Sequence, residues 1–304
     1  MGKSSWTQRF GQALALVTLR QPAFWERSWK HRVARFAVYT AVCYVAVMAF
    51  LLLLEDRFLH GRRVVQLIRP PSGIAVENVE MTSSRGERIH AWWTTPKDWQ
   101  PEQGAVLFCH GNGGNLSYRG RALSHWIDEL GQAVLLFDYP GYGRSSGEPS
   151  ETSCYAAGDA AYDWLRQIQK VPPERLILYG GSLGGGVAID LAHRRPHRAL
   201  VLVASFTSFP DMAQVCFPWL PGRWLVRNRF DNLGKIAGCR GPVFIAHAPQ
   251  DALIPFAQGQ RLFAAASEPK QFFPLLNYRH NDLPTTDFYP ALRAFLAECE
   301  STPN

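Results

Sequence analysis

Short apolar runs alternate with helical patterns through most of the chain after residue 76. The runs are rich in Val, Leu, Ile, Phe and Ala, and they predict buried strands at 105–109, 133–137, 176–179, 199–204, 243–246 and 272–276. The stretches between them predict helices near 116–130, 152–169, 184–194, 256–267 and 290–299. Strands that are apolar on both faces and separated by helices are typical of a mostly parallel sheet with helices on both faces. The sequence therefore predicts an α/β fold.

Residues 76–96 show a different pattern, in which two strand-like stretches flank a polar turn. The first stretch reads ENVEMTS, the second reads RIHAWWTTP, and SRGE lies between them. Two strands joined by so short a connection pair as an antiparallel hairpin. We therefore expect an antiparallel leading hairpin, followed by the parallel part of the sheet.

The alternation is interrupted at residues 207–237, where no clear strand is found. This segment is unusually aromatic and includes Phe209, Phe217, Trp219, Trp224, Leu225 and Phe230. Such an insertion either fills the core or covers a pocket. We interpret it as a cap insertion, with core packing as the alternative.

The N-terminal part of the chain begins with a basic segment, residues 1–35, which runs into a long apolar one. Residues 36–54 form a stretch of 19 residues without a charged side chain. At about 1.5 Å per residue, a helix of this length nearly spans a hydrocarbon core roughly 30 Å thick. Because no small-residue cleavage site follows, we interpret 36–54 as an uncleaved transmembrane signal anchor rather than a cleaved signal peptide or a buried core helix. Residues 55–75 then form a linker to a catalytic domain at 76–300.

The net charge of +7 is concentrated at the N-terminus. Residues 1–35 contain seven Lys and Arg side chains and one acid, so the rest of the chain carries only +1. This distribution offers no basic face for nucleic acid. Because basic residues favour the cytoplasmic side of a membrane, we expect a cytoplasmic N-terminus and an extracytoplasmic catalytic domain. Four arginines after the apolar stretch weaken this asymmetry: Arg57, Arg62, Arg63 and Arg69.

The sequence gives little sign of a metal or cofactor site. Its six cysteines show neither a CxxC pair nor another metal-ligand spacing. We expect unpaired thiols, with a bridge between Cys216 and Cys239 as the alternative. A phosphate-binding GxxxxGK[ST] motif is absent, and FDYPGYGRSSG lacks the helix pattern of a dinucleotide site. We therefore expect neither a metal nor a cofactor.

A reactive serine is predicted by LILYGGSLGGG, in which Gly180-Gly181-Ser182-Leu183-Gly184 fits G-x-S-x-G between a predicted strand and a predicted helix. A sharp turn at this point holds the serine in a strained conformation, so small residues must flank it. The N-terminus of the following helix offers backbone N–H groups to an oxyanion. We predict Ser182 as the nucleophile, with Gly180 and Gly184 forming its elbow.

Serine becomes a good nucleophile only when a base removes its proton, so a carboxylate and a histidine should follow in that order. Asp251 comes directly after a strand, in HAPQDALIP, and His280 follows the next strand, in YRHND. The ends of parallel strands bring such residues to one edge of the sheet. We predict Asp251 as the acid and His280 as the base. Asp282 is a weaker alternative to Asp251, because it lies only two residues from His280.

A glycine-rich loop, HGNGGN at 110–115, follows the strand at 105–109. Its glycines allow the backbone to approach a developing negative charge. We predict that the backbone N–H groups of Asn112 and Leu183 form an oxyanion hole, with Gly113 as a close alternative to Asn112. His110 is interpreted as a histidine that braces the turn, and not as a catalytic one.

With these motifs in this order, the chain resembles the α/β-hydrolase superfamily. It is most similar to membrane-anchored members related to serine aminopeptidases and monoacylglycerol lipases. The resemblance covers about residues 76–299 and rests on six motifs: HGNGGN at 110–115, DYPGYGRSSG at 138–147, GGSLGG around Ser182, SFTSFPDMA at 205–213, HAPQDALIP at 247–255 and RHND at 279–282. Ala248 replaces a frequent glycine, and Tyr278 and Arg279 replace small residues before the histidine.

The resemblance implies carboxylic-ester hydrolysis through an acyl-enzyme, with Ser182, Asp251 and His280 matching the nucleophile, acid and base. We expect a membrane-anchored serine hydrolase, and the anchor and aromatic segment favour lipid or lysolipid esters among small-molecule substrates. Thioesters, or amides and peptides, are alternative substrates for the same triad. A non-catalytic scaffold with this fold is the alternative from another class. Hydrolases of epoxides or haloalkanes use a carboxylate where Ser182 stands.

Overall fold

The computed structural model describes residues 29–59, 70, 73–219, 221, 225–283 and 287–301. The chain divides into two compact units, Met1–Leu53 and Leu54–Asn304, which we describe separately. Residues 1–28 of the predicted basic segment lie outside the described residues, as do residues 60–69, 71 and 72 of the predicted linker. The structure therefore describes only parts of these two segments.

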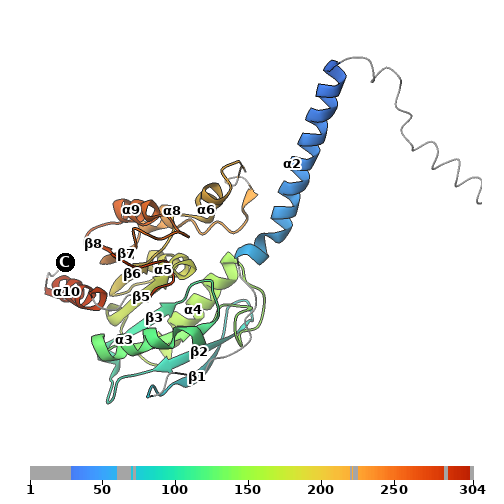
Figure 1. Ribbon diagram of the computed structural model, residues 1–304. Coiled ribbons are helices and arrows are strands. Elements are labelled where there is room, and N and C mark those ends of the chain that lie inside the picture. The colour runs from blue at the N-terminus through green and yellow to red at the C-terminus, as the bar shows by residue number, and fades with distance from the viewer. Residues whose placement is uncertain are drawn as a thin grey trace, which may run out of the picture. The chain divides into compact units, whose positions relative to one another are not determined.

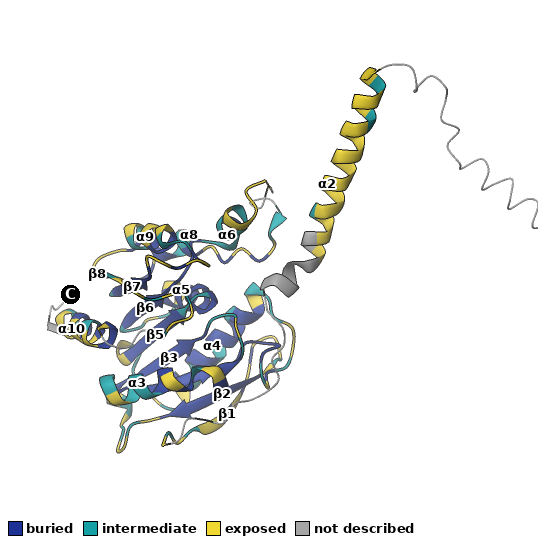
Figure 2. Ribbon diagram, viewed as in Figure 1, coloured by how far each residue is buried: buried dark blue, intermediate teal, exposed yellow. Residues whose placement is uncertain are grey.

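The first unit contributes most of one long helix, α2 (Trp29–Leu59). An 18-residue stretch within Trp29–Phe50 of this helix has a mean hydropathy of 1.8, and none of the residues Trp29–Phe50 is buried. In Figure 2 the ribbon of this part of the helix is coloured mostly as exposed. The predicted span 36–54 lies within α2, which extends beyond it at both ends because Lys, Arg and Glu are good helix formers. By length and composition this helix could cross a membrane or serve as a signal sequence.

The second unit contains an eight-stranded sheet within the described residues (Figure 1). Its strands are β1 (Glu77–Thr82), β2 (Arg88–Thr94), β3 (Ala105–Cys109), β4 (Ala133–Phe137), β5 (Leu176–Gly181), β6 (Ala199–Val203), β7 (Val243–His247) and β8 (Lys270–Pro274). The strand order is β1-β2-β4-β3-β5-β6-β7-β8. β1 and β2 pair antiparallel, β2 pairs antiparallel with β4, and all the other pairs are parallel. The predicted mostly parallel sheet with an antiparallel leading hairpin is confirmed.

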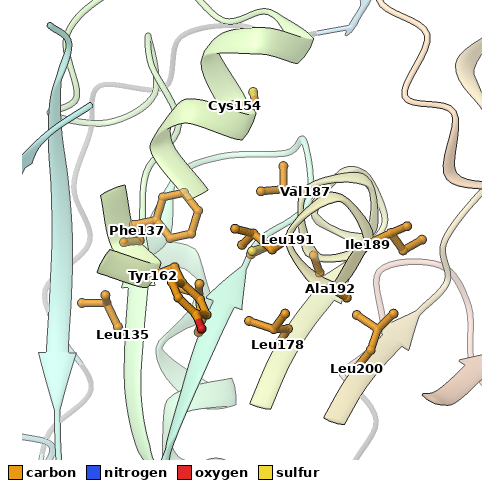
Figure 3. Close-up of a cluster of buried hydrophobic side chains, with 14 of the residues drawn as sticks. Leu135, Phe137, Cys154, Tyr162, Leu178, Val187, Ile189, Leu191, Ala192 and Leu200 are labelled. Atoms are coloured by element: carbon orange, nitrogen blue, oxygen red, sulfur yellow. The ribbon is translucent and has the colours of Figure 1, made fainter. Parts of the chain in front are cut away.

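Helices cover both faces of the sheet, because successive side chains of each strand point to opposite faces. Ala105, Leu107 and Cys109 of β3 pack into one apolar core, while Val106 and Phe108 pack into the other. The first core includes residues of α4 (Glu151–Gln167), α5 (Leu183–Arg194), α8 (Asn232–Ile236) and α9 (Phe256–Ala265). Figure 3 shows part of it, where α4 and α5 meet the sheet. The second core includes residues of α3 (Gly120–Leu130) and α10 (Phe288–Ser301).

The last strand is displaced from its predicted position. β8 runs over Lys270–Pro274 rather than 272–276, and Ile245 of β7 pairs with Phe272. An edge strand bonds to one neighbour only, so it tolerates polar residues such as Lys270 and Gln271 that an apolar pattern leaves out. Leu276 lies beyond the strand and is exposed.

The described part of the aromatic segment 207–237 has two different environments. Phe230 is fully buried, and its ring centroid lies 4.7 Å from that of Phe209 in α6 (Phe209–Cys216). Phe217 and Trp219 follow α6 and are exposed. Trp224 lies outside the described residues. One part of this segment therefore fills the core, and its role as a cap stays a prediction.

Candidate active site

The predicted triad residues follow the carboxyl ends of three strands in one half of the sheet. Ser182 comes directly after β5, Asp251 follows β7, and His280 follows β8. The strand order β5-β6-β7-β8 places these ends in sequence along one edge. Parallel strands therefore bring together three residues that are far apart in the chain.

Ser182 occupies a sharp turn between β5 and α5. Its φ of 52° and ψ of −117° are rare for a residue with a side chain and store backbone strain. Two backbone hydrogen bonds hold this conformation: Ser182 N–H donates to the carbonyl of Val203 at 2.9 Å, and Gly185 N–H donates to the carbonyl of Ser182 at 2.9 Å. The turn presents the serine at the N-terminus of α5.

Close packing explains the glycines around Ser182. A Cβ on Gly180 would lie 2.5 Å from the carbonyl oxygen of Gly184, and a Cβ on Gly184 would lie 1.9 Å from the carbonyl oxygen of Cys109. Both distances are far below van der Waals contact. The start of α5 can therefore approach the end of β3 only because these positions lack side chains.

The three predicted side chains form a continuous hydrogen-bonded chain. His280 Nε2 lies 3.1 Å from Ser182 Oγ, and His280 Nδ1 lies 2.7 Å from Asp251 Oδ2. An ionised carboxylate can only accept, so the Nδ1–H group of His280 donates to Asp251. His280 Nε2 is then free to accept the proton of the Ser182 hydroxyl, which is the arrangement that general-base catalysis needs.

Asp251 is held as a charged, buried carboxylate. Its Oδ1 accepts from the backbone N–H groups of Leu253, at 2.9 Å, and Ile254, at 2.8 Å. His247 Nε2 lies 3.4 Å from Oδ2 and also bonds to the Ile254 carbonyl, so it braces this loop. Burial raises the pKa of Asp251, but hydrogen bonds from His247, His280 and Ile254 more than offset this and leave the pKa well below its usual range.

We expect Asp251→Asn to weaken the acid dependence of stability. The pKa of Asp251 is lower in the folded protein than in the unfolded chain, where it is about 3.9. The charged carboxylate therefore stabilises the folded protein at pH values above the unfolded pKa of about 3.9. This stabilisation is lost as the pH falls from there toward the pKa of the folded protein. Urea unfolding at a series of pH values from about 7 to about 3 measures the effect. Equal pH dependence in wild type and variant would contradict the assigned contacts, and Asp128→Asn on the exposed face of α3 is the matched control.

The glycine-rich loop 110–115 lies beside the serine. A Cβ on Gly111 would meet Ser182 Cβ at 3.4 Å. Among the described residues, the backbone N–H groups of Asn112, Gly113 and Leu183 have no hydrogen-bond acceptor. They therefore remain available to a negatively charged oxygen, and the choice between Asn112 and Gly113 stays open. The hydroxyl of Tyr142 donates to the side-chain oxygen of Asn112 and restrains this part of the loop.

His110 braces the loop 110–115 through its two ring nitrogens. It is fully buried, its Nδ1 lies 2.7 Å from the Gly111 carbonyl oxygen, and its Nε2 lies 3.3 Å from Asp138 Oδ1. Asp138 Oδ1 also accepts from the backbone N–H of Leu116 at 2.7 Å. These contacts match the predicted bracing role. Asp282, the weaker candidate for the acid, accepts instead from the backbone N–H of Arg279 at 2.7 Å.

A cavity of about 660 Å³ opens at Ser182 and His280, which is the size of a small-molecule site. Part of its wall is apolar and is formed by Phe108, Tyr179, Val203, Ala204 and Leu283. Its polar lining includes Tyr118, Arg119 and Arg121, which belong to the turn before α3 and its first residues. No sequence motif singled these three out. Among the described residues, none from the segment 207–237 lines the cavity.

A larger cavity, of about 1100 Å³, lies elsewhere on the sheet. It is lined by residues at the amino ends of the strands, including Arg175, Arg198, Pro242 and Lys270. Ligand sites of open parallel sheets occur at the carboxyl ends instead. The cavity at Ser182 is therefore the better candidate for the active site, although it is the smaller of the two.

The described residues contain no group of three or more His, Cys, Asp or Glu side chains that could hold a metal ion. All cysteines in this part of the chain are free thiols, including Cys216 and Cys239.

Comparison with known proteins decides the family. Residues 104–226 match a family model described as the α/β hydrolase fold. The α/β hydrolase domain-containing protein 17B of Xenopus laevis is 32% identical over 234 residues, which cover 74% of this chain and 76% of that protein. The chain belongs to the α/β-hydrolase family. An uncharacterized protein of Mycobacterium tuberculosis is 38% identical to this α/β hydrolase over 227 residues, covering 74% of this chain and 80% of that one.

Solved structures show the same fold at low sequence identity. The esterase Pf2001 of Pyrococcus furiosus is 16% identical with a TM-score of 0.61, covering 80% of this α/β hydrolase and 100% of that chain. The acetyl xylan esterase of Paenibacillus sp. R4 is 20% identical with a TM-score of 0.62, and the match covers 81% of this α/β hydrolase and 92% of that chain. These structures confirm the predicted α/β-hydrolase fold.

Proposed function

We propose that this α/β hydrolase is a serine hydrolase that cleaves carboxylic esters through an acyl-enzyme. The observation that carries the proposal is the chain of contacts from Ser182 Oγ through His280 to Asp251, with distances of 3.1 Å and 2.7 Å. This chain lies in a cavity large enough for a small-molecule ester.

The geometry supports acylation of Ser182 through a tetrahedral intermediate. Ser182 Oγ attacks the ester carbonyl carbon while His280 Nε2 takes the hydroxyl proton. Asp251, already charged, stabilises the imidazolium that forms. The negative oxygen of the tetrahedral intermediate accepts hydrogen bonds from the backbone N–H group of Leu183 and from that of Asn112 or Gly113. When the carbon–oxygen bond to the alcohol breaks, His280 returns the proton to the leaving oxygen, and the acyl group remains on Ser182.

Deacylation repeats these steps with water. His280 Nε2 removes a proton from a water molecule, whose oxygen attacks the acyl carbonyl. The second tetrahedral intermediate collapses, His280 gives the proton to Ser182 Oγ, and the carboxylic acid leaves. Each round consumes one ester and one water and releases one alcohol and one acid, so no cofactor is required.

Substrate chemistry is tested with three compounds that share one acyl chain and differ in the leaving group. We expect the alkyl ester to be hydrolysed with a higher kcat/KM than the matched amide, because an alkoxide leaves more readily than an amine. The thioester measures the alternative thioesterase activity. A folded protein that hydrolyses the amide or the thioester faster than the ester would contradict the esterase proposal, and one that hydrolyses none of them would favour a non-catalytic scaffold.

We also propose that α2 anchors the enzyme in a membrane with its N-terminus in the cytoplasm. The uncharged stretch 36–54, of which no residue up to Phe50 is buried, and the basic residues before position 36 support this arrangement. The exposed Phe217 and Trp219 also suit a lipid environment, which favours lipid or lysolipid esters as substrates.

Membrane fractionation tests the anchor. We expect the protein to stay in the membrane pellet after alkaline carbonate extraction and to be released by detergent. Each arginine placed at the centre of a spanning helix costs about 3 kcal/mol of insertion free energy, so Val42→Arg with Val45→Arg should move the protein to the soluble fraction. Release of wild type by carbonate would contradict the anchor.

Protease added outside intact cells tests the orientation. Protection of the catalytic domain from this protease would contradict the proposed orientation.

A further inference from the structure

Arg119 brings a guanidinium into the active-site cavity without a carboxylate partner. Arg119 Nη2 donates to the carbonyl oxygen of Gly113 at 2.6 Å. Its Nε is buried and has no hydrogen-bond partner, and none of the ion pairs among the described residues involves this side chain. Arginine has five N–H donors, so most of its capacity is unused.

The guanidinium lies close to the reacting serine. A Cβ on Gly111 would meet Ser182 Cβ at 3.4 Å and Arg119 Nη2 at 4.0 Å, so both side chains lie around the same glycine. Ser182 and Arg119 also line the same cavity. A substrate whose carbonyl sits at Ser182 would therefore have neighbouring atoms within reach of Arg119.

The surroundings of Arg119 favour negative charge. The cavity contains the first residues of α3, and Ser182 stands at the N-terminus of α5, where backbone N–H groups carry partial positive charge. Neither helix has an acidic residue in its first turn. Arg121 adds a second, exposed guanidinium to the lining, and Asp282 is its only carboxylate among the described residues.

A partly buried guanidinium without a counter-ion is costly, because the charge has lost part of its hydration. Burial lowers the pKa of Arg119, although Tyr179, Tyr139 and Asp138 act in the opposite direction. The nearby Asp138 accepts through Oδ1 from the Leu116 N–H, Oδ1 lies 3.3 Å from His110 Nε2, and none of the ion pairs among the described residues joins Asp138 to Arg119. An anionic group on a bound molecule would supply the missing partner.

We propose that Arg119 binds a carboxylate or phosphate group on the substrate, so that the preferred ester carries a negative charge near its scissile bond. The planar guanidinium can bind either group through two parallel N–H bonds, which a neutral substituent does not match. This inference rests on the proposed esterase function and adds a substrate class to it.

A purely structural role for Arg119 is the competing explanation, since its bond to Gly113 also supports the loop 110–115. The two roles differ in what they predict for matched substrates. Loss of loop support lowers the hydrolysis of charged and neutral esters by the same factor. Loss of an anion-binding group lowers the hydrolysis of the charged ester more.

The test therefore compares kcat/KM within two pairs of esters. The first pair, para-nitrophenyl hemisuccinate and para-nitrophenyl butyrate, differs in charge on the acyl side. The second pair, the phosphate monoester of monobutyrylglycerol and monobutyrylglycerol itself, differs in charge on the alcohol side. We expect wild type to prefer the anionic ester by about tenfold or more in at least one pair, as a charge-assisted hydrogen bond predicts.

Arg119→Gln should lower this preference by about tenfold or more, whereas Arg119→Lys, which keeps the charge but not the paired N–H bonds, should lower it less. Arg293→Gln on the exposed face of α10 removes the same charge far from the cavity lining and should leave the preference unchanged. Wild type without any preference, or Arg119→Gln with the wild-type preference, would overturn the inference while leaving the esterase proposal intact. If folded wild type cleaved none of the four esters, both this inference and the esterase proposal would be overturned.

Discussion

Replacing Ser182 with alanine is expected to lower kcat for ester hydrolysis by roughly 10⁵-fold or more while the protein remains folded. The hydroxyl oxygen is the atom that would bond to the acyl carbon, so the acyl-enzyme cannot form without it. Loss of the nucleophile in a related type of triad reduces turnover by a factor of this order. Alanine adds no atoms and adopts the same backbone angles with a similar strain, so thermal unfolding should change by only a few degrees.

Hydrolysis of a chromogenic ester by purified wild type and Ser182→Ala measures this effect, with thermal unfolding as the check on folding. Ser267→Ala is a matched control, because Ser267 bonds to the Ala237 carbonyl and lies outside the cavity lining. It should retain wild-type turnover. Substantial ester cleavage by folded Ser182→Ala would contradict the assignment of Ser182 as the nucleophile.

Gly184→Ala is expected to cause the largest loss of stability. The new Cβ would lie 1.9 Å from the carbonyl oxygen of Cys109 and 2.7 Å from that of His110. Both are backbone atoms at the end of β3, which is paired on its two sides with β4 and β5 and cannot move freely. Overpacking of this kind costs about 3 kcal/mol or more of the free energy of unfolding, and a shift of α5 would also displace Ser182.

Gly181→Ala is the matched control within the same motif. Its Cβ would meet no atom closer than the Tyr179 hydroxyl, at 3.6 Å, and its backbone φ is not in the left-handed region. We expect this variant to stay within about 1 kcal/mol of wild type. Urea unfolding of the two variants provides the comparison. Equal stability of Gly184→Ala and Gly181→Ala would contradict the close approach of α5 to β3.

Much of the fold could be predicted because hydrophobic periodicity reports burial directly. Strands buried on both faces, such as β3 and β4, were predicted with the bounds that the structure shows. The predicted bounds of β8 were wrong by two residues, because an edge strand accepts polar residues that carry no apolar signal. The helix predicted at 116–130 begins as a short 3-10 turn, Leu116–Arg119, before α3 starts at Gly120. Apolar spacing alone does not distinguish these two helical forms.

The candidate site was predictable where chemistry constrains the order of residues. A serine in a strand-to-helix turn requires a base and an acid, and strand ends in a parallel sheet bring Asp251 and His280 to it. Arg119 had no such signal, because its significance depends on its distance from Ser182 and on the lack of a carboxylate partner. Neither property can be deduced from sequence spacing. The aromatic segment 207–237 showed the same ambiguity, since an apolar residue such as Phe230 suits both a core and a cap.

The most direct test of the account is labelling of purified wild type and Ser182→Ala with a fluorophosphonate, followed by mass spectrometric mapping of the modified peptide. A serine activated by a histidine and a carboxylate reacts with this probe, whereas an ordinary serine does not. The account predicts one modified residue, Ser182, in wild type and no modification of Ser182→Ala. A well-folded wild type that remains unlabelled, or labelling of another serine in both proteins, would contradict it.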